Sequence, residues 1–470
     1  MSQSVARGLK VVIPLLVALL IGVAPAPEGL TQQAMIYVGI FVCVVAWLVV
    51  RAVPDWAAFL TAIAAYVVFG LAKFSEVFAS FADSTIWVLF GAFGISTVIA
   101  KTGLVKRLAF WVLRLFPENY RGQMTAFFTT GIIISPFIPA LIGKGVILSP
   151  IAAAASKALG YAKRSKAATG LFLAVWVTAG ILGYAFMTGA APVLITIGML
   201  PADQQADWTW VRWFMACAVW FVAVALLSYV AILFLSGATR DDDAIQHIEK
   251  GFAKKQLEEL GPMSRDEKLT VVLLVLAVVG WIFGSKVGLS AAVVSVSIFA
   301  IMALVGLADT NDVTNKMPWD TLILIGGILA LASLLTKLGI STWLAGVMAP
   351  IAAPIVANPY LYVFAVCVLT YLVRLVVVSS VATQVIFLAA LGGVATASGI
   401  NPFVTLFVCG ASTNVWHLRF TNNVFIPILR ATDGEMCEHE DTLPFDFAFM
   451  VINLVACLAS VPVWQAMGLA

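Results

Sequence analysis

Charged residues are scarce in this chain of 470 residues, in which Asp, Glu, Lys and Arg together make up 11%. A soluble protein carries about a quarter charged residues, so this chain is not a typical soluble domain. Hydrophobic residues make up 62%, and the mean hydropathy is +1.03. Many apolar runs reach the ~20 residues that cross ~30 Å of hydrocarbon. Because the runs are continuous rather than alternating, they exclude a β-barrel and predict an all-α polytopic membrane protein.

Residues for hydrolytic or metal chemistry are also few. The chain has three histidines, and two of them, His247 and His439, lie in charged loops. Its six cysteines lack metal-ligand spacing and lie mostly in apolar runs, which favours buried, small hydrophobic side chains. No Ser/His/Asp arrangement occurs. We therefore predict no enzymatic activity and no cofactor. The net charge of +3 gives no support for nucleic-acid binding, because basic residues in membrane proteins cluster by side of the membrane.

The apolar runs predict about 11 transmembrane helices. A basic start before the first run is compatible with a cleaved signal, but no clear cleavage site follows it. A retained first span with a cytoplasmic N-terminus is therefore favoured. The predicted spans lie near residues 10–25, 35–50, 54–72, 85–100, 167–200, 211–237, 269–285, 289–307, 320–336, 404–428 and 444–467.

Residues 122–156 lie between two basic clusters. Excess Lys and Arg mark the cytoplasmic side, so both ends of this segment are expected there. About a dozen residues lead each way to SPFIPALIGKG (135–145), and at 1.5 Å per residue each arm reaches ~18 Å, about half the membrane. We therefore predict a re-entrant hairpin whose tip lies near 135–145. The clusters are Lys101, Lys106, Arg107, Arg114 and Arg121 on one side, and Lys157, Lys163, Arg164 and Lys166 on the other.

The second half repeats this design. Segment 84–104 aligns with 320–340 at a constant offset, so that Lys101 matches Lys337. A second hairpin is predicted at about 360–397, and its flanks are nearly free of Lys and Arg, which is typical of the opposite side. An odd number of spans in each unit predicts two inverted repeats. The predicted organisation is an N-terminal helix (1–34), a first inverted repeat (35–237), a cytoplasmic amphipathic linker (238–268) and a second inverted repeat (269–470).

Each unit also interrupts the span that follows its hairpin. The first interruption is predicted at 185–195 and the second at 410–426. Unpaired backbone at membrane depth is tolerated only where it is buried in protein or lines a wet cavity. Helix N-termini at such breaks favour anions, while freed carbonyls and hydroxyls can coordinate a cation such as sodium. Two hairpins and two broken helices therefore predict an anion site near the membrane midplane.

Polar candidates for this site concentrate in the second break. An ionisable residue within the membrane indicates a functional site by default. Arg419 can hold a carboxylate or sulfonate bidentately, and Lys144 can act as a point charge. Alternatively, Arg419 and His417 lie just past the span at the interface. Arg374 either enters the cavity or lies at a hairpin neck, and Trp416 either packs or stacks on substrate. The predicted substrate-binding residues are Pro139, Ala140, Lys144, Thr188, Ser379, Ser380, Thr383, Ser412, Thr413, Asn414, His417, Arg419, Thr421, Asn422 and Asn423.

The two repeat openings, FADSTIWVLFGAFGISTVIAKTGLVKRLAF and MPWDTLILIGGILALASLLTKLGI, resemble those of the divalent anion/sodium symporter family of the ion-transporter superfamily. The resemblance covers the chain from about residue 35 to its end. It implies a homodimer in which each protomer has a scaffold domain and a transport domain that moves as an elevator. It also implies secondary transport of di- or tricarboxylates, usually coupled to sodium and sometimes by exchange.

The chain departs from the family's sequence motifs at the hairpin tips and at the broken helices. The family's Ser-Asn-Thr motif at each hairpin tip is Ala-Leu-Ile at 140–142 and Ser-Ser-Val at 379–381. Its Gly-Thr-Pro-Pro-Asn pattern corresponds to Gly-Ala-Ala-Pro-Val at 189–193 in the first unit. In the second unit it corresponds approximately to residues 419–423, of which only the final Asn matches. We hypothesise that Lys144 replaces a first cation site with a fixed charge. By the resemblance, sodium would lie near Leu141, Ile142, Gly189, Ser379, Thr383 and Asn423.

The favoured function is therefore a secondary active transporter of dicarboxylate-like organic anions in a cytoplasmic membrane, coupled to sodium. One alternative is a proton-coupled or exchange carrier of another anion, such as a sulfonate, an aromatic acid or an inorganic oxyanion. Further alternatives are an anion channel with a transporter-like fold and a receptor that does not transport. Flux measurements distinguish these alternatives, because only a carrier shows saturation and counterflow. The expected partners are a small organic anion, the lipid bilayer and a second copy of the chain.

Overall fold

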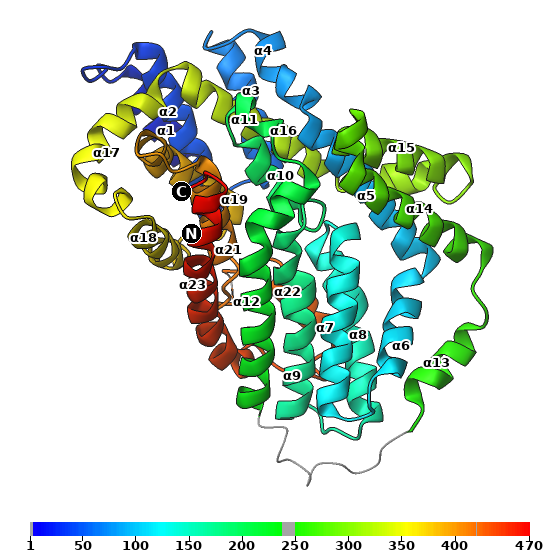
Figure 1. Cartoon of the computed structure of the whole chain (residues 1–470). Coiled ribbons are helices and arrows are strands. Elements are labelled where there is room, and N and C mark those ends of the chain that lie inside the picture. Colours follow the sequence, from blue (N-terminus) through cyan, green and yellow to red (C-terminus); the bar gives the residue numbers. More distant parts are fainter. Residues whose placement is uncertain (1–2, 237–249, 420) are drawn as a thin grey trace.

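The computed structural model describes residues 3–236, 250–419 and 421–470. Within these ranges the chain is built from helices, with no strand (Figure 1). Nine of the described helices are long and apolar enough to cross a membrane, and several shorter apolar helices accompany them. The prediction of an all-α polytopic membrane protein is confirmed. His247 and the first part of the predicted linker lie outside the described residues.

Helix boundaries in the first part of the chain follow local capping. The Thr31 side chain accepts from the N–H of Ala34, and the Asp83 side chain accepts from the N–H of Thr85. Gly103, with a φ of +75°, ends one helix and starts the next, because glycine adopts the left-handed conformation without a Cβ penalty. The helices here are α1 (Gln3–Val23), α2 (Gln32–Val50), α3 (Asp55–Val68), α4 (Phe74–Phe78), α5 (Ser84–Thr102) and α6 (Leu104–Leu115).

A helical hairpin and a broken helix follow. Helices α7 (Tyr120–Ile134) and α8 (Leu141–Ala158) are the arms of the first hairpin, with 15 and 18 residues against the dozen expected for each. Prolines at 136 and 139 keep its tip out of regular helix. Helix α9 (Lys166–Val175) continues through π and 3₁₀ turns to Ala185, and α10 (Ala191–Gly198) resumes after residues 186–190. We call residues 186–190 the first break.

The same order of elements recurs in the second half. A second hairpin is formed by α18 and α19, and residues 413–424, the second break, separate α21 from α22. Helix α3 packs on α16, α15 on α5, and α12 on α23, so the two halves interlock. The remaining helices are α11 (Ala202–Gln205), α12 (Trp210–Ser236), α13 (Phe252–Leu260), α14 (Arg265–Phe283), α15 (Ala291–Leu304), α16 (Trp319–Lys337), α17 (Ile340–Val356), α18 (Pro359–Val373), α19 (Ser380–Phe387), α20 (Gly393–Ala397), α21 (Pro402–Ser412), α22 (Phe425–Arg430) and α23 (Leu443–Ala466).

Helices α6 and α17 were not among the predicted spans. Helix α6 carries Lys106, Arg107 and Arg114, which disqualify it as an apolar run. Helix α17 contains Pro350 and Pro354, which weaken a helical prediction. Each of these helices directly precedes the hairpin of its half.

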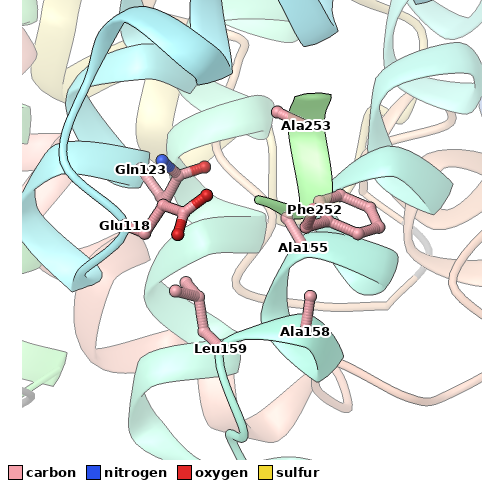
Figure 2. Close-up of a pocket in the computed structure, with 7 residues that line it drawn as sticks. All are labelled: Glu118, Gln123, Ala155, Ala158, Leu159, Phe252 and Ala253. Atoms are coloured by element: carbon pink, nitrogen blue, oxygen red, sulfur yellow. The ribbon is translucent and has the colours of Figure 1, made fainter. Parts of the chain in front are cut away.

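The described part of the linker is fastened to the first half. Helix α13 packs on α6, and the Arg107 guanidinium bonds Glu267 at 2.6 Å and the Gly261 carbonyl at 2.7 Å. The Glu118 carboxylate accepts from the N–H of Gly251 at the start of α13. Figure 2 shows α13 over the outer end of the first hairpin, where a small pocket is lined by Glu118, Gln123, Ala155, Ala158, Leu159, Phe252 and Ala253. This lining is mostly apolar and holds no cation, so the pocket is not suited to an anion.

Candidate functional site

Lys144 is a fully buried cation at the tip of the first hairpin. It lies one turn into α8, and its Nζ donates to the carbonyl of Gly189 in the first break at 2.9 Å. A Cβ added at Gly183 would lie 2.7 Å from the same nitrogen. Among the described residues, no carboxylate forms an ion pair with Lys144. Since a buried ammonium is costly unless it is compensated by opposite charge and hydrogen bonds, a single neutral carbonyl leaves this charge largely uncompensated.

Main-chain carbonyls join the hairpin tip to the first break. The N–H of Ala191 donates to the Pro139 carbonyl at 3.2 Å, and Thr188 Oγ1 donates to the Pro136 carbonyl at 2.6 Å. A Cβ at Gly189 would lie 2.5 Å from the Gly183 carbonyl oxygen, so this close approach requires glycine. These contacts therefore hold the tip and the break close enough for Lys144 to donate to the Gly189 carbonyl.

Arg374 is a second buried cation without a carboxylate partner in the described chain. It ends α18 at the tip of the second hairpin, and 2% of its surface is exposed. Its guanidinium donates to the carbonyls of Val377 and Val378 in the tip and of Thr421 in the second break. The structure places Arg374 at the hairpin tip and inside the protein. Each half thus has a hairpin cation that donates to a main-chain carbonyl of its own break.

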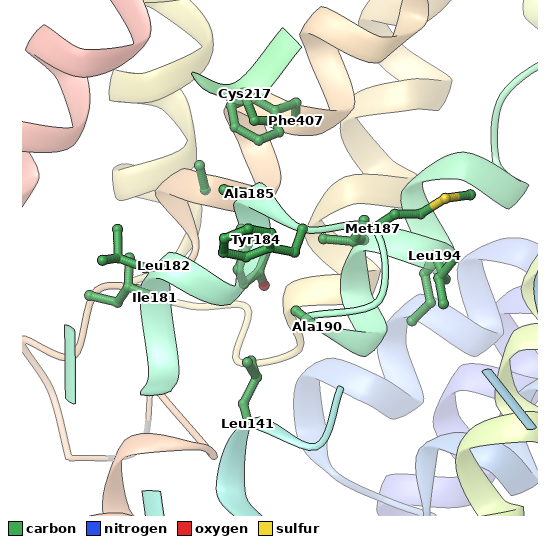
Figure 3. Packing of buried hydrophobic residues seen from close by; sticks show 14 of the residues in the cluster. Leu141, Ile181, Leu182, Tyr184, Ala185, Met187, Ala190, Leu194, Cys217 and Phe407 are labelled. Carbon is green, nitrogen blue, oxygen red and sulfur yellow. The ribbon is translucent and has the colours of Figure 1, made fainter. Parts of the chain in front are cut away.

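Tyr184 connects the two cations. It directly follows Gly183, which lies against Lys144, and its buried hydroxyl interacts with the side chains of Ser380, Thr413 and Asn414 and, electrostatically, with Arg374. Its carbonyl accepts from Trp213 Nε1 at 3.1 Å. Figure 3 shows the tyrosine between apolar side chains, with its oxygen on the side of Leu141 and Ala190. We define the polar cluster as Lys144, Tyr184, Arg374, Ser380, Thr413 and Asn414.

The polar cluster is closed to solvent and mixes both halves of the chain. Ser380 and Thr413 approach each other with their hydroxyl oxygens 2.5 Å apart. Asn414 bonds the carbonyls of Gly410 and Ala411 at the end of α21. Five of the six members are buried and Ser380 is half-buried. An anion can reach the two cations only if the hairpins or the breaks move.

Several predicted site residues have side chains that are bonded within local structure. Ser379 Oγ caps α19 by accepting from the N–H of Ala382, and Asn422 Oδ1 caps α22 by accepting from the N–H of Phe425. These caps satisfy free N–H groups at helix starts. Four other predicted hydroxyls donate hydrogen bonds to partners inside the protein: Thr188, Thr383, Ser412 and Thr421.

Three predicted residues are exposed. Arg419 has a side chain that is 62% exposed and pairs with Glu440 at 3.0 Å, as its alternative interfacial position implies. Ile142 is 40% exposed, and Asn423 is also exposed. Arg419 therefore has an acidic partner of its own, whereas the cations of the polar cluster have none.

His417 lies beside a buried carboxylate that the sequence analysis missed. Its Nδ1 is 3.7 Å from Oδ2 of Asp446, whose other oxygen accepts from the N–H of Trp416 at 2.9 Å. The Trp416 ring packs between other rings, with centroids 5.3 Å from Trp176 and 5.1 Å from Phe425. Of the two roles left open for Trp416, the structure shows packing.

The residues of the first half do not fit a sodium ion at Gly189. The carbonyl of Gly189 already accepts from Lys144, and the neighbouring tip residues Leu141 and Ile142 have no side-chain oxygen. Around the second tip, Thr383 Oγ1 bonds the Ser379 carbonyl at 2.9 Å. In the described chain, no group of three or more His, Cys, Asp or Glu residues could hold a metal ion. At the first predicted ion position, the Gly189 carbonyl accepts from the chain's own ammonium group.

Comparison with known proteins places this geometry in a transporter family. The family model described as the sodium:sulfate symporter transmembrane region matches residues 6–464. The chain is 30% identical over 350 residues to Inner membrane protein YbhI of Escherichia coli, which covers 72% of each chain. It is 28% identical to dicarboxylate transporter 2, chloroplastic, of Spinacia oleracea, over 72% of this chain and 61% of that one. It is 25% identical to the L-tartrate/succinate antiporter of Escherichia coli, over 77% and 78%.

A solved structure shares the overall fold. The YdaH transporter of Alcanivorax borkumensis aligns over 99% of this chain and 98% of its own, with a TM-score of 0.56 and 12% sequence identity. At this identity the likeness concerns the fold alone. It agrees with the helical membrane fold of the chain.

Proposed function

Because the chain belongs to the sodium:sulfate symporter family, the divalent anion/sodium symporter family of the sequence resemblance, we propose that it is a secondary transporter of small dicarboxylates. The family assignment made from the repeat openings is confirmed. The chain is a multi-pass membrane protein and an anion transporter, and several of its matched relatives bear the names of transporters. The dicarboxylate substrate is the step that we add.

One observation carries this proposal: two buried cations near neighbouring residues of one segment lack carboxylate partners in the described chain. Lys144 lies against Gly183, Arg374 acts electrostatically on the next residue, Tyr184, and both cations donate to neutral carbonyls. A substrate with two negative groups would compensate both charges and accept hydrogen bonds from them. The hydroxyls of Tyr184, Ser380 and Thr413 add neutral donors beside the same position.

The same two cations favour exchange without sodium. Lys144 provides the positive charge that a sodium ion would bring to the carbonyl of Gly189. An empty site that carries two uncompensated cations is costly to move through a low-dielectric layer, whereas the anion-loaded site is not. This cost favours a carrier that returns only with another anion bound. The relative named as an antiporter supports this reading. Sodium coupling, expected from the family, is the alternative.

An elevator movement suits the closed cluster. The residues of the polar cluster come from both hairpins, from the turn before the first break and from the second break, so they can travel as one unit while the other spans remain fixed in the membrane. We place the chain as a homodimer in the cytoplasmic membrane, with the N-terminus and the basic ends of the first hairpin on the cytoplasmic side, by the excess of Lys and Arg there.

Counterflow in liposomes tests the proposal. Purified protein is reconstituted into liposomes loaded with succinate, and entry of labelled succinate is followed with sodium or with choline outside. We expect saturable counterflow that is the same in both cations. Entry that requires sodium would refute the exchange mechanism, and flux of sulfate without flux of any dicarboxylate would refute the substrate class. Conduction without saturation or counterflow would indicate a channel, and binding without flux would indicate a receptor.

A further inference from the structure

We propose that His417 and Asp446 form a proton-binding pair and that the proton travels with the anion. This inference rests on the proposed transport function, to which it adds a coupling ion. His417 lies within the second break, on the loop that follows Thr413 and Asn414 of the polar cluster, and Asp446 lies in the first turn of α23. Neither residue is needed to contact the anion.

The first argument is that this pair is buried and lacks partners. Asp446 is fully buried, and the His417 side chain is 9% exposed. Asp446 Oδ2 and both ring nitrogens of His417 have no hydrogen-bond partner in the described protein. Most buried polar atoms in folded proteins are bonded, so two unpartnered atoms that face each other, Nδ1 of His417 and Oδ2 of Asp446, mark a place for something to bind. At 3.7 Å, Nδ1 and Oδ2 are about 1 Å beyond a hydrogen bond, and a shared proton would draw them together.

The second argument comes from the charged groups around the imidazole. Asp446 is the carboxylate on α23 that faces His417. Arg374 from the second hairpin and His439 before α23 also act on it electrostatically. His439 Nε2 donates to the Trp416 carbonyl at 2.7 Å, as a neutral ring can. The fixed charge of Arg374 opposes a proton on His417, whereas Asp446 attracts one.

An anion bound at Arg374 would remove that opposition. Once a carboxylate of the anion compensates the guanidinium, Arg374 repels a proton on His417 less strongly. The attraction of that proton by Asp446 then dominates. By thermodynamic reciprocity, the proton then strengthens anion binding by the same factor. Anion and proton are therefore expected to bind together.

The third argument is the charge balance of the buried groups. The described buried charges outside this region are paired: Arg107 with Glu267, and Asp312 with Lys101 and Lys316. This leaves Lys144, Arg374 and Asp446, which together carry one net positive charge when all three are ionised and His417 and His439 are neutral. A bound dicarboxylate turns this into one net negative charge. One proton on the His417–Asp446 pair makes the loaded site neutral, which is the cheapest state to move through hydrocarbon.

Proton uptake on anion binding tests this inference directly. Tartrate is added to the full-length detergent-solubilised protein in weak buffer with a pH-indicator dye. Because ordinary carboxyl groups titrate near ~4, tartrate itself is fully ionised between about pH 6 and about pH 8. We expect uptake of about one proton per bound tartrate, and an affinity that rises up to about tenfold per unit of falling pH.

Two variants assign the proton. Asp446→Asn keeps an oxygen that can accept from the N–H of Trp416, and His417→Gln keeps a polar side chain of similar length. Both should bind tartrate without proton uptake and with an affinity that does not depend on pH. His439→Gln is the control, because glutamine can still donate to the Trp416 carbonyl, and it should keep the uptake. Loss of uptake in His439→Gln alone would overturn the assignment.

The outcomes separate this inference from the function on which it rests. Failure to bind or exchange any dicarboxylate would remove the proposed function. Binding and counterflow without proton uptake in the unaltered protein would overturn only the His417–Asp446 proposal. Equal pH dependence in the unaltered protein and in Asp446→Asn would overturn it as well.

Discussion

The ammonium nitrogen of Lys144 lies 2.9 Å from the carbonyl oxygen of Gly189, so the first hairpin carries a cation to the first break. Replacing Lys144 with Gln should lower dicarboxylate affinity at least tenfold, because a hydrogen bond to a charged group contributes ~1.5–3 kcal/mol and ~1.4 kcal/mol is a tenfold change. Thermal-shift titration with succinate measures the affinity. Lys163→Gln is the control, since Lys163 pairs with Glu435 at an exposed position. Unchanged affinity in Lys144→Gln would contradict the role of this charge.

Gly183→Ala should displace that cation without altering its charge. The added Cβ would lie 2.6 Å from the Gly189 carbonyl oxygen and 2.7 Å from Lys144 Nζ, closer than real contacts allow. We expect lower succinate affinity and slower counterflow. Gly143→Ala, on the hairpin that carries Lys144, is the control, because its Cβ would meet only Ala140, at 3.4 Å. Equal transport by both variants would show that the position of Lys144 is not critical.

Tyr184→Phe should weaken anion binding several-fold while the fold persists. The ring would still fill its apolar surroundings, but the hydroxyl that faces Ser380 and Thr413 would be lost. A neutral hydrogen bond contributes ~0.5–1.5 kcal/mol, which sets the size of the effect. Tyr362→Phe provides the comparison, because that hydroxyl is also buried but bonds Thr405 at 2.6 Å. Tyr362→Phe should reduce thermal stability and leave affinity unchanged; the same affinity loss in both would argue against a site role for Tyr184.

Arg107→Met should destabilise the fold by ~3–5 kcal/mol, the usual cost of leaving one partner of a buried ion pair alone. Both side chains of the Arg107–Glu267 pair are under one-tenth exposed, and the guanidinium also holds the Gly261 carbonyl. Adding Glu267→Gln should restore part of the loss, because the uncompensated charge is then removed. Thermal unfolding in detergent measures both variants. A double variant no more stable than the single one would contradict this account.

Asp312 should contribute stability that acid removes. Burial raises the pKa of its carboxyl, but hydrogen bonds from Lys101 and Lys316 outweigh burial and lower the pKa to about 2. An unfolded aspartate titrates near ~3.9, so this stabilisation is complete above about pH 4 and is lost as the pH falls toward about 2. The gap in unfolding temperature between the unaltered protein and Asp312→Asn should therefore close over that range. A gap that stays constant with pH would refute the prediction.

The interruptions could be predicted because their causes are local. Prolines, glycines and polar residues within an apolar run break a helix wherever the chain folds, so the break before α10 and the tip before α8 fall within the predicted stretches. The helices α6 and α17 could not be recognised, because charge and proline obscure their apolar faces. Their role depends on neighbouring helices that the sequence does not show.

The site was only partly predictable because its members meet through tertiary packing. A lysine in an apolar run is conspicuous, so Lys144 could be singled out from sequence. Tyr184 is not conspicuous, because a tyrosine near a membrane span is common and its position one residue before the predicted break carries no signal. Arg419 attracted attention by its neighbours in sequence, yet the chain turns outward there and gives it Glu440 as a partner. Asp446 stood in the first turn of a span, where an acidic residue usually stabilises the helix start.

The contact of Glu118 with the N–H of Gly251 has a consequence for the timing of transport. Helix α13 is held by α6 through Arg107 at one end and by the entry to the first hairpin through Glu118 at the other. If the hairpin shifts relative to α6 by more than the length of a hydrogen bond, one of these attachments must open. Substitutions in this linker should therefore change the turnover rate while leaving equilibrium anion affinity intact.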